Sequence, residues 1–263
     1  MRRRLALVLI ALPGLAPTGA AQPVGEVMVT RALDGESVAL SDGRVVRLAG
    51  VRAPRPEGPG DVLGEALALA ARETLTRLAA GRRCTLDLVA PTRDRYGRLV
   101  ARLACAPDFG DLAAALTGAG RVIVFPGPGE AGAAAPPYAV EAAARKARRG
   151  LWASGRYDVV AAAAVDAPSG RLVIVRGRVL AAARVESVLY LNFGADWRHD
   201  FTVRLTNTVR RRLPRERRVA GWWRGRLIEV RGLLLYENGP LVEPGDPAQI
   251  RILAAAPERK PAP

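Results

Sequence analysis

Three arginines stand close together in the stretch Val45 to Arg55, VVRLAGVRAPR, which contains no acidic residue. They are Arg47, Arg52 and Arg55, and they lie within nine residues. A guanidinium stays charged in proteins, and its planar donors match the oxygens of a phosphate group. The stretch begins as an alternating apolar strand and ends in a loop with a proline. We therefore expect these side chains to form the floor of a phosphate-binding site.

A fourth arginine lies in the segment DRYGR, residues 94–98, which has the composition of a tight turn between two strands. Arg98 ends this segment, and Tyr96 stands two residues before it. An arginine at a strand end and another on a tight hairpin could hold one phosphate together through charge-assisted hydrogen bonds. The sequence therefore predicts a phosphate clamp made of Arg47 and Arg98.

The whole chain is strongly basic. It has 263 residues and a formal net charge of +15 at pH 7, and its pI is about 11.2. Such an excess of cations suggests a polyanionic partner, which could be nucleic acid, acidic lipid or acidic glycan. The alternative is an arginine-rich composition whose charges are simply solvated. Apolar residues make up 49% of the chain, enough for one large or two small cores.

The first 21 residues have the pattern of a cleaved export signal. Arg2 to Arg4 are followed by the apolar run Leu5 to Leu15 and by small residues up to Ala21. The apolar run is too short to cross a bilayer, which needs about 20 residues. We therefore expect a signal peptide at residues 1–21 and a periplasmic or secreted protein without a stable membrane anchor.

Export would make the two cysteines informative. Cys84 and Cys105 lie on two predicted strands on either side of the turn near residues 93–97, at about equal distances from it. In an oxidising compartment they could form a disulfide across the hairpin. The alternative is two buried free thiols. A zinc site is disfavoured, because the only histidine, His199, is far away in the sequence.

The first half of the chain has the alternation of apolar and polar residues expected for a small β-barrel with helices. Asp-Gly pairs at residues 34–35 and 42–43 separate three alternating runs between residues 26 and 51, which predicts a three-stranded meander. A helix is expected from the N-cap Asp61 to about Ala80, followed by the cysteine hairpin. Shorter elements are expected at 111–116 (helix), 121–125 (strand), 125–137 (loop) and 140–149 (helix). This order suits a five-stranded OB-type barrel over residues 24–153.

The second half repeats the pattern without a clear repeat of sequence. Strands are expected at 171–180, 187–193, 201–205, 226–236 and 241–253, with a polar, partly helical segment at 206–221. We expect a second small OB-like β domain over residues 158–254 and a flexible tail at 255–263. The predicted fold class is therefore mainly β with α (α+β), with two barrels in tandem.

Five segments in order resemble the staphylococcal-nuclease-like, or thermonuclease, family over about Val24 to Trp152. They are ALDGES (32–37), RLAGVRAP (47–54), DRYGR (94–98), GAGRV (118–122) and EAAARKARRGLW (141–152). The resemblance implies an OB-fold phosphodiesterase that uses calcium on single-stranded or frayed DNA and RNA. In that family, carboxylates hold the metal and prepare the attacking water, and two arginines stabilise the charge of the transition state.

The resemblance assigns roles to four residues of this chain. Arg47 and Arg98 match the two catalytic arginines, and Tyr96 matches the aromatic hydroxyl of the turn. Glu36 matches a metal-binding aspartate, so it is the catalytic and metal-binding acid that remains if the protein is active.

Two acids that the family normally carries are missing. Their positions hold Arg52 and Arg55, and arginine can neither ligate calcium nor act as a base. Glu36 alone would be a poor calcium site. Glu57 could swing in as a replacement base, although the loop would have to change shape. We therefore expect no cofactor, with Ca²⁺ as the ion if the ancestral site is retained.

The functional prediction has three branches. The first is an exported thermonuclease-like protein that binds nucleic-acid phosphates through Arg47, Arg52, Arg55, Arg98 and Tyr96, with lost or reduced calcium-dependent phosphodiesterase activity. The second is an active nuclease that hydrolyses DNA or RNA with Arg47, Arg98 and a rearranged acid. The third is a structural or protein-interaction module. The expected partner in the first two branches is single-stranded DNA or RNA.

The second half shows no catalytic pattern. His199 is interpreted as a structural hydrogen-bonding residue. The rings of Tyr190, Phe193, Trp197 and Phe201 could stack on bases, but packing in the core is the preferred interpretation. Arginines recur between residues 210 and 218, followed by two tryptophans, and they could follow a phosphate backbone or form a solvated connector. We favour an accessory nucleic-acid-binding module.

Overall fold

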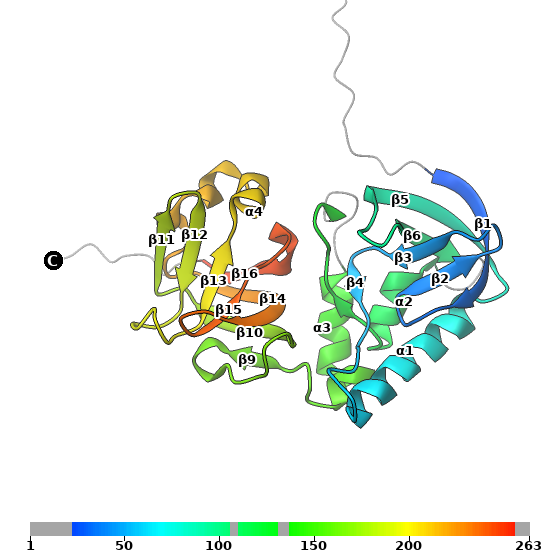
Figure 1. Cartoon of the computed structure of the whole chain (residues 1–263), viewed down its shortest axis with the longest axis horizontal. Helices are drawn as coiled ribbons and strands as arrows, with labels where there is room; N and C mark the ends of the chain where they lie inside the picture. The colour runs from blue at the N-terminus through cyan, green and yellow to red at the C-terminus, as the bar shows by residue number, and fades with distance from the viewer. Residues whose placement is uncertain (1–22, 106–109, 131–136, 256–263) are drawn as a thin grey trace, which may run out of the picture.

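The structure is a computed structural model that describes residues 23–105, 110–130 and 137–255. The predicted signal peptide lies outside the described residues, as does all but the first residue of the predicted tail. Two lobes lie side by side, and the helix α3 (Tyr138–Lys146) stands between them (Figure 1). No helix in the described part of the chain has the length and hydropathy needed to cross a membrane.

The first lobe is a closed five-stranded barrel, as predicted. Its strand order is β3-β2-β1-β5-β6, and β6 closes the barrel by pairing in parallel with β3. A parallel third and fifth strand with a helix between the third and fourth is the OB topology. The strands are β1 (Pro23–Ala32), β2 (Ser37–Leu40), β3 (Val45–Leu48), β5 (Arg83–Arg93) and β6 (Leu99–Cys105), with β7 (Gly110–Asp111) added beside β6.

Helices pack against this barrel and contribute residues to its core. The helix α1 (Val62–Ala79) begins where Asp61 accepts a hydrogen bond from Gly64 N at 2.9 Å, so the predicted N-cap is confirmed. The other elements of this lobe are α2 (Leu112–Gly118), the two-stranded ribbon of β4 (Val51–Arg52) and β8 (Ile123–Val124), and the 3₁₀ helix η2 (Gly150–Ala153). The alternating apolar residues of the meander point into a core that also takes Leu75 of α1 and Leu112 of α2.

The predicted disulfide is confirmed. Cys84 and Cys105 are directly opposite each other in the β5–β6 ladder, with their Cα atoms 4.1 Å apart, and their sulfurs are bonded. The two residues are almost fully buried. The bond therefore ties together the two strands of the hairpin, β5 and β6, at the end away from the DRYGR turn.

The second lobe is also a barrel with OB connectivity. Its strands run in the order β11-β12-β13-β15-β14-β10, and β13 pairs in parallel with β15. Because β10 and β11 follow each other along the chain, the bend at residues 179–180 closes the barrel. The strands are β10 (Leu172–Arg178), β11 (Ala181–Val185), β12 (Val188–Asn192), β13 (Thr202–Leu205), β14 (Leu227–Tyr236) and β15 (Pro240–Val242).

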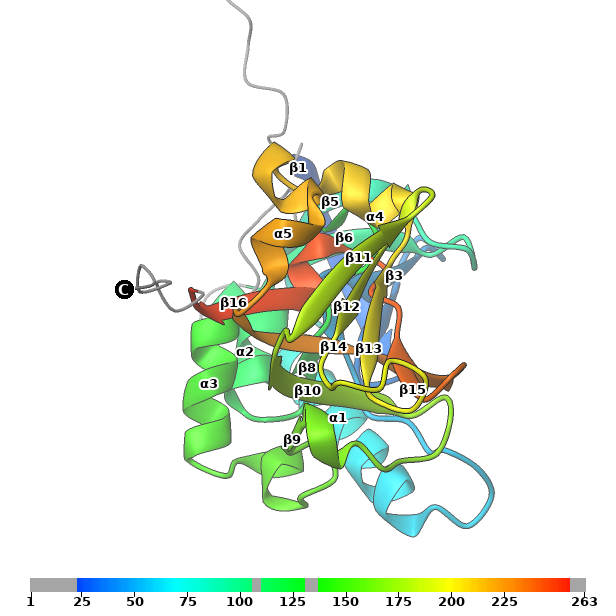
Figure 2. The same cartoon turned by 90° about the vertical axis from the view of Figure 1, so that its left-hand side faces the viewer.

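Further elements extend the second barrel. The strand β9 (Val159–Ala161) pairs with β10, and β16 (Ile250–Ala254) pairs with β14. The predicted polar segment forms α4 (Asn207–Arg212), η4 (Arg215–Arg218) and α5 (Ala220–Trp223), which lie at one end of the barrel (Figure 2). Two further 3₁₀ helices are η3 (Ala162–Ala164) and η5 (Pro247–Gln249).

Two expectations about strands in this lobe were wrong in detail. Residues 181–185 form a strand that the alternation did not predict, since its alanines give no contrast between the faces. Residues 241–253 were expected to form one strand, but Pro244 and Pro247 interrupt it, and the chain forms β15, η5 and β16 instead.

Candidate nucleic-acid interface

Arg47 and Arg98 come from two strands that the barrel closure brings together. Arg47 lies on β3, opposite Val100 of β6 in the parallel ladder, and Arg98 directly precedes β6. Both guanidiniums approach the same carboxylate. Asp94 Oδ2 lies 2.7 Å from Arg98 Nη2 and 3.6 Å from Arg47 Nε. The two predicted clamp residues are therefore neighbours, although they are 51 positions apart in the printed sequence.

Asp94 also builds the turn that carries Arg98. Its Oδ1 accepts hydrogen bonds from the backbone N of Tyr96 at 2.9 Å and of Arg98 at 3.1 Å. Partial burial works against ionisation, but the hydrogen bonds from Arg98 and from Tyr96 N outweigh it, so the pKa of Asp94 is lowered. Asp94 is therefore a charged positioning group for the turn.

A cleft of about 420 Å³ lies in front of these residues. Its charged lining consists of six arginines and three carboxylates: Arg47, Arg52, Arg55, Arg93, Arg95 and Arg98, with Glu36, Asp94 and Glu130. The wall is therefore net positive, which favours an anionic occupant. We call this cavity the arginine cleft.

Arg52 is the arginine of the cleft with the fewest polar partners. It lies on β4, and its Cζ is 5.4 Å from the centre of the Phe125 ring. No hydrogen bond or ion pair of its guanidinium is found among the described residues. Burial is the largest influence on its pKa and lowers it, which means that the charge is poorly solvated. An anion that entered the cleft would gain most from this side chain.

Arg55 and Glu36 neutralise each other. Arg55 Nη2 lies 2.7 Å from Glu36 Oε1, and Glu36 Oε2 accepts a 2.6 Å hydrogen bond from Ala53 N. Gly35 makes this approach possible, because a Cβ at that position would lie 2.8 Å from the Cβ of Ala53. Glu36 is 3% exposed. Both of its oxygens are therefore engaged, one by a cation and one by the backbone.

The donor set of the cleft does not fit calcium. Calcium requires six to eight oxygen ligands, with converging carboxylates among them. Glu36 is bound to Arg55, and Asp94 is bound to Arg98. In the described ranges, no group of three or more His, Cys, Asp or Glu residues is arranged to hold a metal ion.

Glu130 is a site residue that the sequence analysis missed. Its buried carboxylate is paired with Arg47 Nη2 and accepts a 2.8 Å hydrogen bond from Gly50 N. It comes from the segment 125–137, which was predicted only as a loop. No signal in the sequence marks Glu130, since the contact spans 83 positions and depends on how the loop folds back over the barrel.

The second barrel holds the loop that carries Glu130. Asp246 Oδ2 accepts a hydrogen bond from Gly129 N at 2.9 Å, and Gln249 Nε2 donates to Pro126 O at 2.7 Å. Both acceptor and donor belong to the region of η5, and both side chains are buried. The described part of the loop is therefore fixed by contacts between the two lobes.

Tyr96 lies at the mouth of the cleft and is 65% exposed. Its hydroxyl accepts a 2.6 Å hydrogen bond from Arg95 Nη2, and the Cζ of Arg98 lies 5.4 Å from its ring centre. The ring and the two arginines form an exposed cationic and aromatic edge. Such an edge can stack on a base while it contacts a phosphate.

Glu57 does not contribute to the arginine cleft. Its carboxylate is bound by Arg171 Nη2 at 2.7 Å and by Arg156 Nη2 at 2.9 Å. Glu57 is absent from the lining of the cleft. The idea of Glu57 as a replacement base is therefore not supported by its position.

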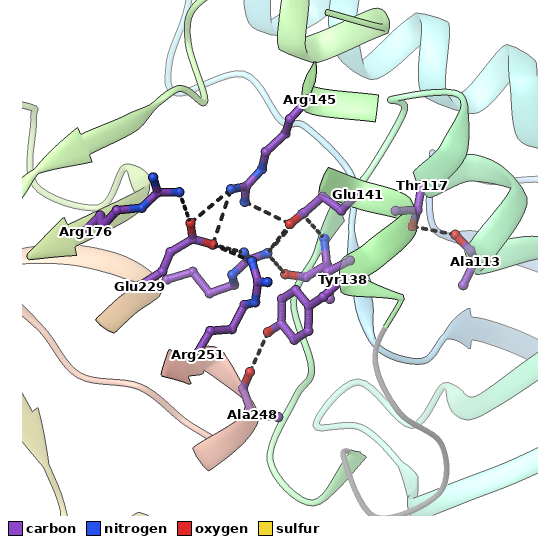
Figure 3. Close-up of polar contacts among 11 residues, drawn as sticks. Ala113, Thr117, Tyr138, Glu141, Arg145, Arg176, Glu229, Ala248 and Arg251 are labelled. Carbon is purple, nitrogen blue, oxygen red and sulfur yellow. Dashed lines mark hydrogen bonds and ion pairs between the residues drawn. The ribbon is translucent and has the colours of Figure 1, made fainter. Parts of the chain in front are cut away.

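A buried ionic network fixes the lobes to each other (Figure 3). Arg231 of β14 is fully buried and binds both oxygens of Glu141 on α3 at 3.0 Å. Glu141 Oε1 also accepts a 2.8 Å hydrogen bond from Val124 N of β8, the strand that pairs with Arg52 on β4. The second barrel therefore helps to fix the backbone beside Arg52.

Glu229 is the other acid of this network. It lies between four guanidiniums at 2.8 to 3.3 Å, those of Arg145, Arg176, Arg231 and Arg251. Burial works against its charge, but the surrounding arginines outweigh burial and lower the pKa of Glu229 to about 2. The hydroxyl of Tyr138 donates to Ala248 O nearby, and burial raises the pKa of Tyr138 to about 12.

The candidate residues of the second barrel divide into core and surface groups. Phe201 is buried in the core, and its ring centre lies 5.2 Å from that of Phe193. Trp197 is 51% exposed with Arg198 stacked on it, so core packing was wrong for this ring. His199 is exposed, and its Nδ1 lies 2.7 Å from Asp196 Oδ2, which fits its predicted structural role.

Comparison with known proteins agrees with the geometry of the first barrel. Residues 45–154 match the model of the family described as Staphylococcal nuclease homologue. No curated protein matches the chain. The matched range contains β3, α1, the β5–β6 hairpin and every arginine of the cleft. The first barrel is therefore a staphylococcal-nuclease-like domain.

Proposed function

We propose that this protein binds single-stranded DNA or RNA through the arginine cleft and does so without calcium. The observation that carries the proposal is the composition of the cleft, where six arginines face three carboxylates. Each carboxylate is held by an arginine, whereas the guanidinium of Arg52 lies over Phe125. A phosphate that enters would meet an electropositive wall with one poorly solvated cation.

The same arrangement argues against efficient phosphodiester hydrolysis. Hydrolysis needs a group that prepares the water and charges that bind the transition state more tightly than the ground state. Arg52 and Arg55 occupy the positions at which the family carries acids, and Arg55 holds Glu36 in an ion pair. Fixed arginines alone bind the phosphate of substrate and transition state about equally well.

An active nuclease is the second candidate, and Glu130 is the observation that favours it. This buried carboxylate reaches the cleft from another segment and contacts Arg47, one of the two arginines that match the catalytic pair. It would be the rearranged acid that takes a proton from the attacking water. In this case Arg47 and Arg98 would stabilise the charge on the phosphate.

We also propose that the protein is exported to a periplasm or secreted. The proposal is supported by the export-like pattern of residues 1–21 and by the disulfide between Cys84 and Cys105. Structural disulfides are rare where thiols are kept reduced. Mass spectrometry of the protein from its native compartment would test this, since the expected mature N-terminus is Gln22.

The decisive experiment measures binding and cleavage on the same preparation. Labelled single-stranded DNA and RNA are titrated with full-length protein over a range of salt concentrations, with calcium and with a chelator. The proposal expects calcium-independent binding that weakens steeply with salt, without cleavage. Cleavage that is lost in Arg47→Ala and Glu130→Gln would establish the second candidate. Absent or salt-independent binding would refute both and favour a structural role.

A further inference from the structure

A second cavity of about 310 Å³ lies between the two barrels. The first barrel and the segment after it contribute Arg52, Arg55, Glu57 and Tyr157, and the second barrel contributes residues 168–172 and Leu233. Its lining contains three arginines, Arg52, Arg55 and Arg171, and one glutamate, Glu57. We call this cavity the interdomain groove.

The interdomain groove is continuous with the arginine cleft. Arg52 and Arg55 line both cavities, so these two residues form the ridge between them. The Arg55 side chain is 51% exposed, and Arg52 lines the groove together with Tyr157 and the cleft together with Arg95. A flexible polyanion bound in the cleft could therefore cross the ridge and remain in a region of positive electrostatic potential.

The groove is built in advance by ion pairs. Arg171 binds Glu57 through Nε at 2.9 Å and Nη2 at 2.7 Å, and Arg156 binds Glu57 and Asp61. These contacts tie the loop before α1 to the segment before β10 of the second barrel. Arg156 and Arg171 balance Glu57 and Asp61, so this cluster is neutral, and the further positive charge on the groove wall comes from Arg52 and Arg55.

Tyr157 adds a polar group to the groove wall. Its side chain is buried, yet no hydrogen bond of its hydroxyl is found among the described residues, and it lines the cavity. Burial is the largest influence on its pKa and raises it, so the hydroxyl stays protonated and can donate. Ser169 also lines the groove and is exposed, and its hydroxyl lies 3.5 Å from Leu234 O.

We propose that the interdomain groove is a second phosphate subsite, so that a single-stranded nucleic acid runs from the arginine cleft over Arg52 and Arg55 and into the groove beside Arg171. This inference rests on the proposed function of the cleft and gives the second barrel a role. The second barrel supplies a cation and one wall for the strand. The chemistry recognised is the sugar–phosphate backbone, because the groove offers charges and hydroxyls rather than an exposed aromatic ring.

Oligothymidylates of two lengths test the subsite on the full-length protein. A 5′-phosphorylated dinucleotide probes the cleft, and a strand of about ten nucleotides can span both cavities. Isothermal titration calorimetry is expected to show a clear gain of affinity with length. Arg171→Gln should weaken binding of the longer strand about tenfold and reduce its salt slope by about 0.7, the value for one lost phosphate contact on a single strand. Dinucleotide binding should stay unchanged.

Two further variants control for loss of the ion pair. Ser169→Asp places a negative charge in the groove without removing Arg171, and it should also weaken only the longer strand. Arg184→Gln removes the same charge from an exposed position that does not line the groove, and it should bind both probes like wild type. If Arg171→Gln has a lowered melting temperature, the binding of the longer strand to Ser169→Asp decides whether the groove is a subsite.

The outcomes separate this inference from the proposed function. If the dinucleotide binds but length brings no gain, or if both groove variants bind the longer strand like wild type, the subsite is refuted while the cleft stands. If neither probe binds the wild-type protein, the proposed function fails, and the subsite fails with it.

Discussion

Arg55 Nη2 lies 2.7 Å from Glu36 Oε1, so the residue that replaces one expected acid neutralises another. One arginine, at a position where the family resemblance implies an acid, therefore removes two potential metal ligands. The second oxygen of Glu36 is bound to Ala53 N, which leaves the carboxylate without a free oxygen for a cation. The net positive charge of the cleft wall favours an anion instead.

Reversing the two substitutions should create a calcium site. In Arg52→Asp/Arg55→Glu, Glu36 loses its cationic partner and two new carboxylates stand beside it. Millimolar calcium should raise the melting temperature of this variant by several degrees, since a ligand that binds only the folded state stabilises it. Differential scanning fluorimetry measures the shift without relying on activity.

Wild type and Arg83→Asp are the comparisons for that experiment. Arg83 is exposed on β5 and does not line the cleft. Neither protein should respond to calcium. A calcium shift in wild type equal to that of the double variant would contradict our account of Glu36.

Removal of Arg52 should weaken nucleic-acid binding strongly. Arg52→Gln is expected to bind single-stranded DNA about tenfold more weakly, because a charge-assisted hydrogen bond contributes about 1.5–3 kcal/mol. The slope of affinity against salt should fall by about 0.7. Fluorescence anisotropy measures both, with Arg83→Gln as the matched loss of charge. Equal effects of the two variants would mean that net charge alone drives binding.

Glu130 should compete with a bound phosphate for Arg47 if the protein binds nucleic acid without cleaving it. Glu130→Gln can still accept the hydrogen bond from Gly50 N but no longer neutralises Arg47. Affinity for the dinucleotide is expected to rise about tenfold, or about 1.4 kcal/mol. Glu237→Gln, which removes an exposed partner of Arg204 in the second barrel, should leave affinity unchanged. Weaker binding in Glu130→Gln would show that Glu130 orients Arg47 rather than competing for it.

Loss of the disulfide should destabilise the first barrel. The bond closes a loop with a sequence separation of 21 residues, which corresponds to about 3 kcal/mol of unfolding free energy in the chain-entropy description. Urea unfolding of Cys84→Ser/Cys105→Ser is expected to show this loss. Dithiothreitol should destabilise wild type and leave the variant unaffected; an equal response of both proteins would contradict a structural role.

Acid should weaken the network between the lobes. The pKa of Glu229 is lowered from 4.5 to about 2, so its contribution is complete above the unfolded value and is lost as the pH falls through the folded value. The shift corresponds to about 3 kcal/mol. The difference in unfolding free energy between wild type and Glu229→Gln should therefore shrink between pH 5 and pH 2. A constant difference over this range would contradict the assignment.

Local patterns were enough to predict most of the elements. The Asp-Gly turns, the N-cap Asp61 and the alternation of β1 to β3 act between near neighbours in the chain, and these elements formed where they were expected. The short range of the cysteine hairpin also made the disulfide predictable. Two elements were harder to predict. The alanines of β11 give no contrast in hydrophobicity between the two faces of the strand. The prolines around η5 interrupt a strand only at certain positions in a sheet, and the sequence does not give these positions.

The residue types of the arginine cleft were determined by the sequence. Arg47, Arg52, Arg55 and Arg98 could be identified as phosphate-binding candidates, because charge and donor geometry belong to the side chain itself. Which of them are neutralised was decided only by the tertiary structure. Glu130 reaches Arg47 across 83 positions, and Arg171 reaches Glu57 across 114. Such pairings depend on how loops and barrels pack, because a charge interacts with whatever the fold brings near it, regardless of distance along the chain.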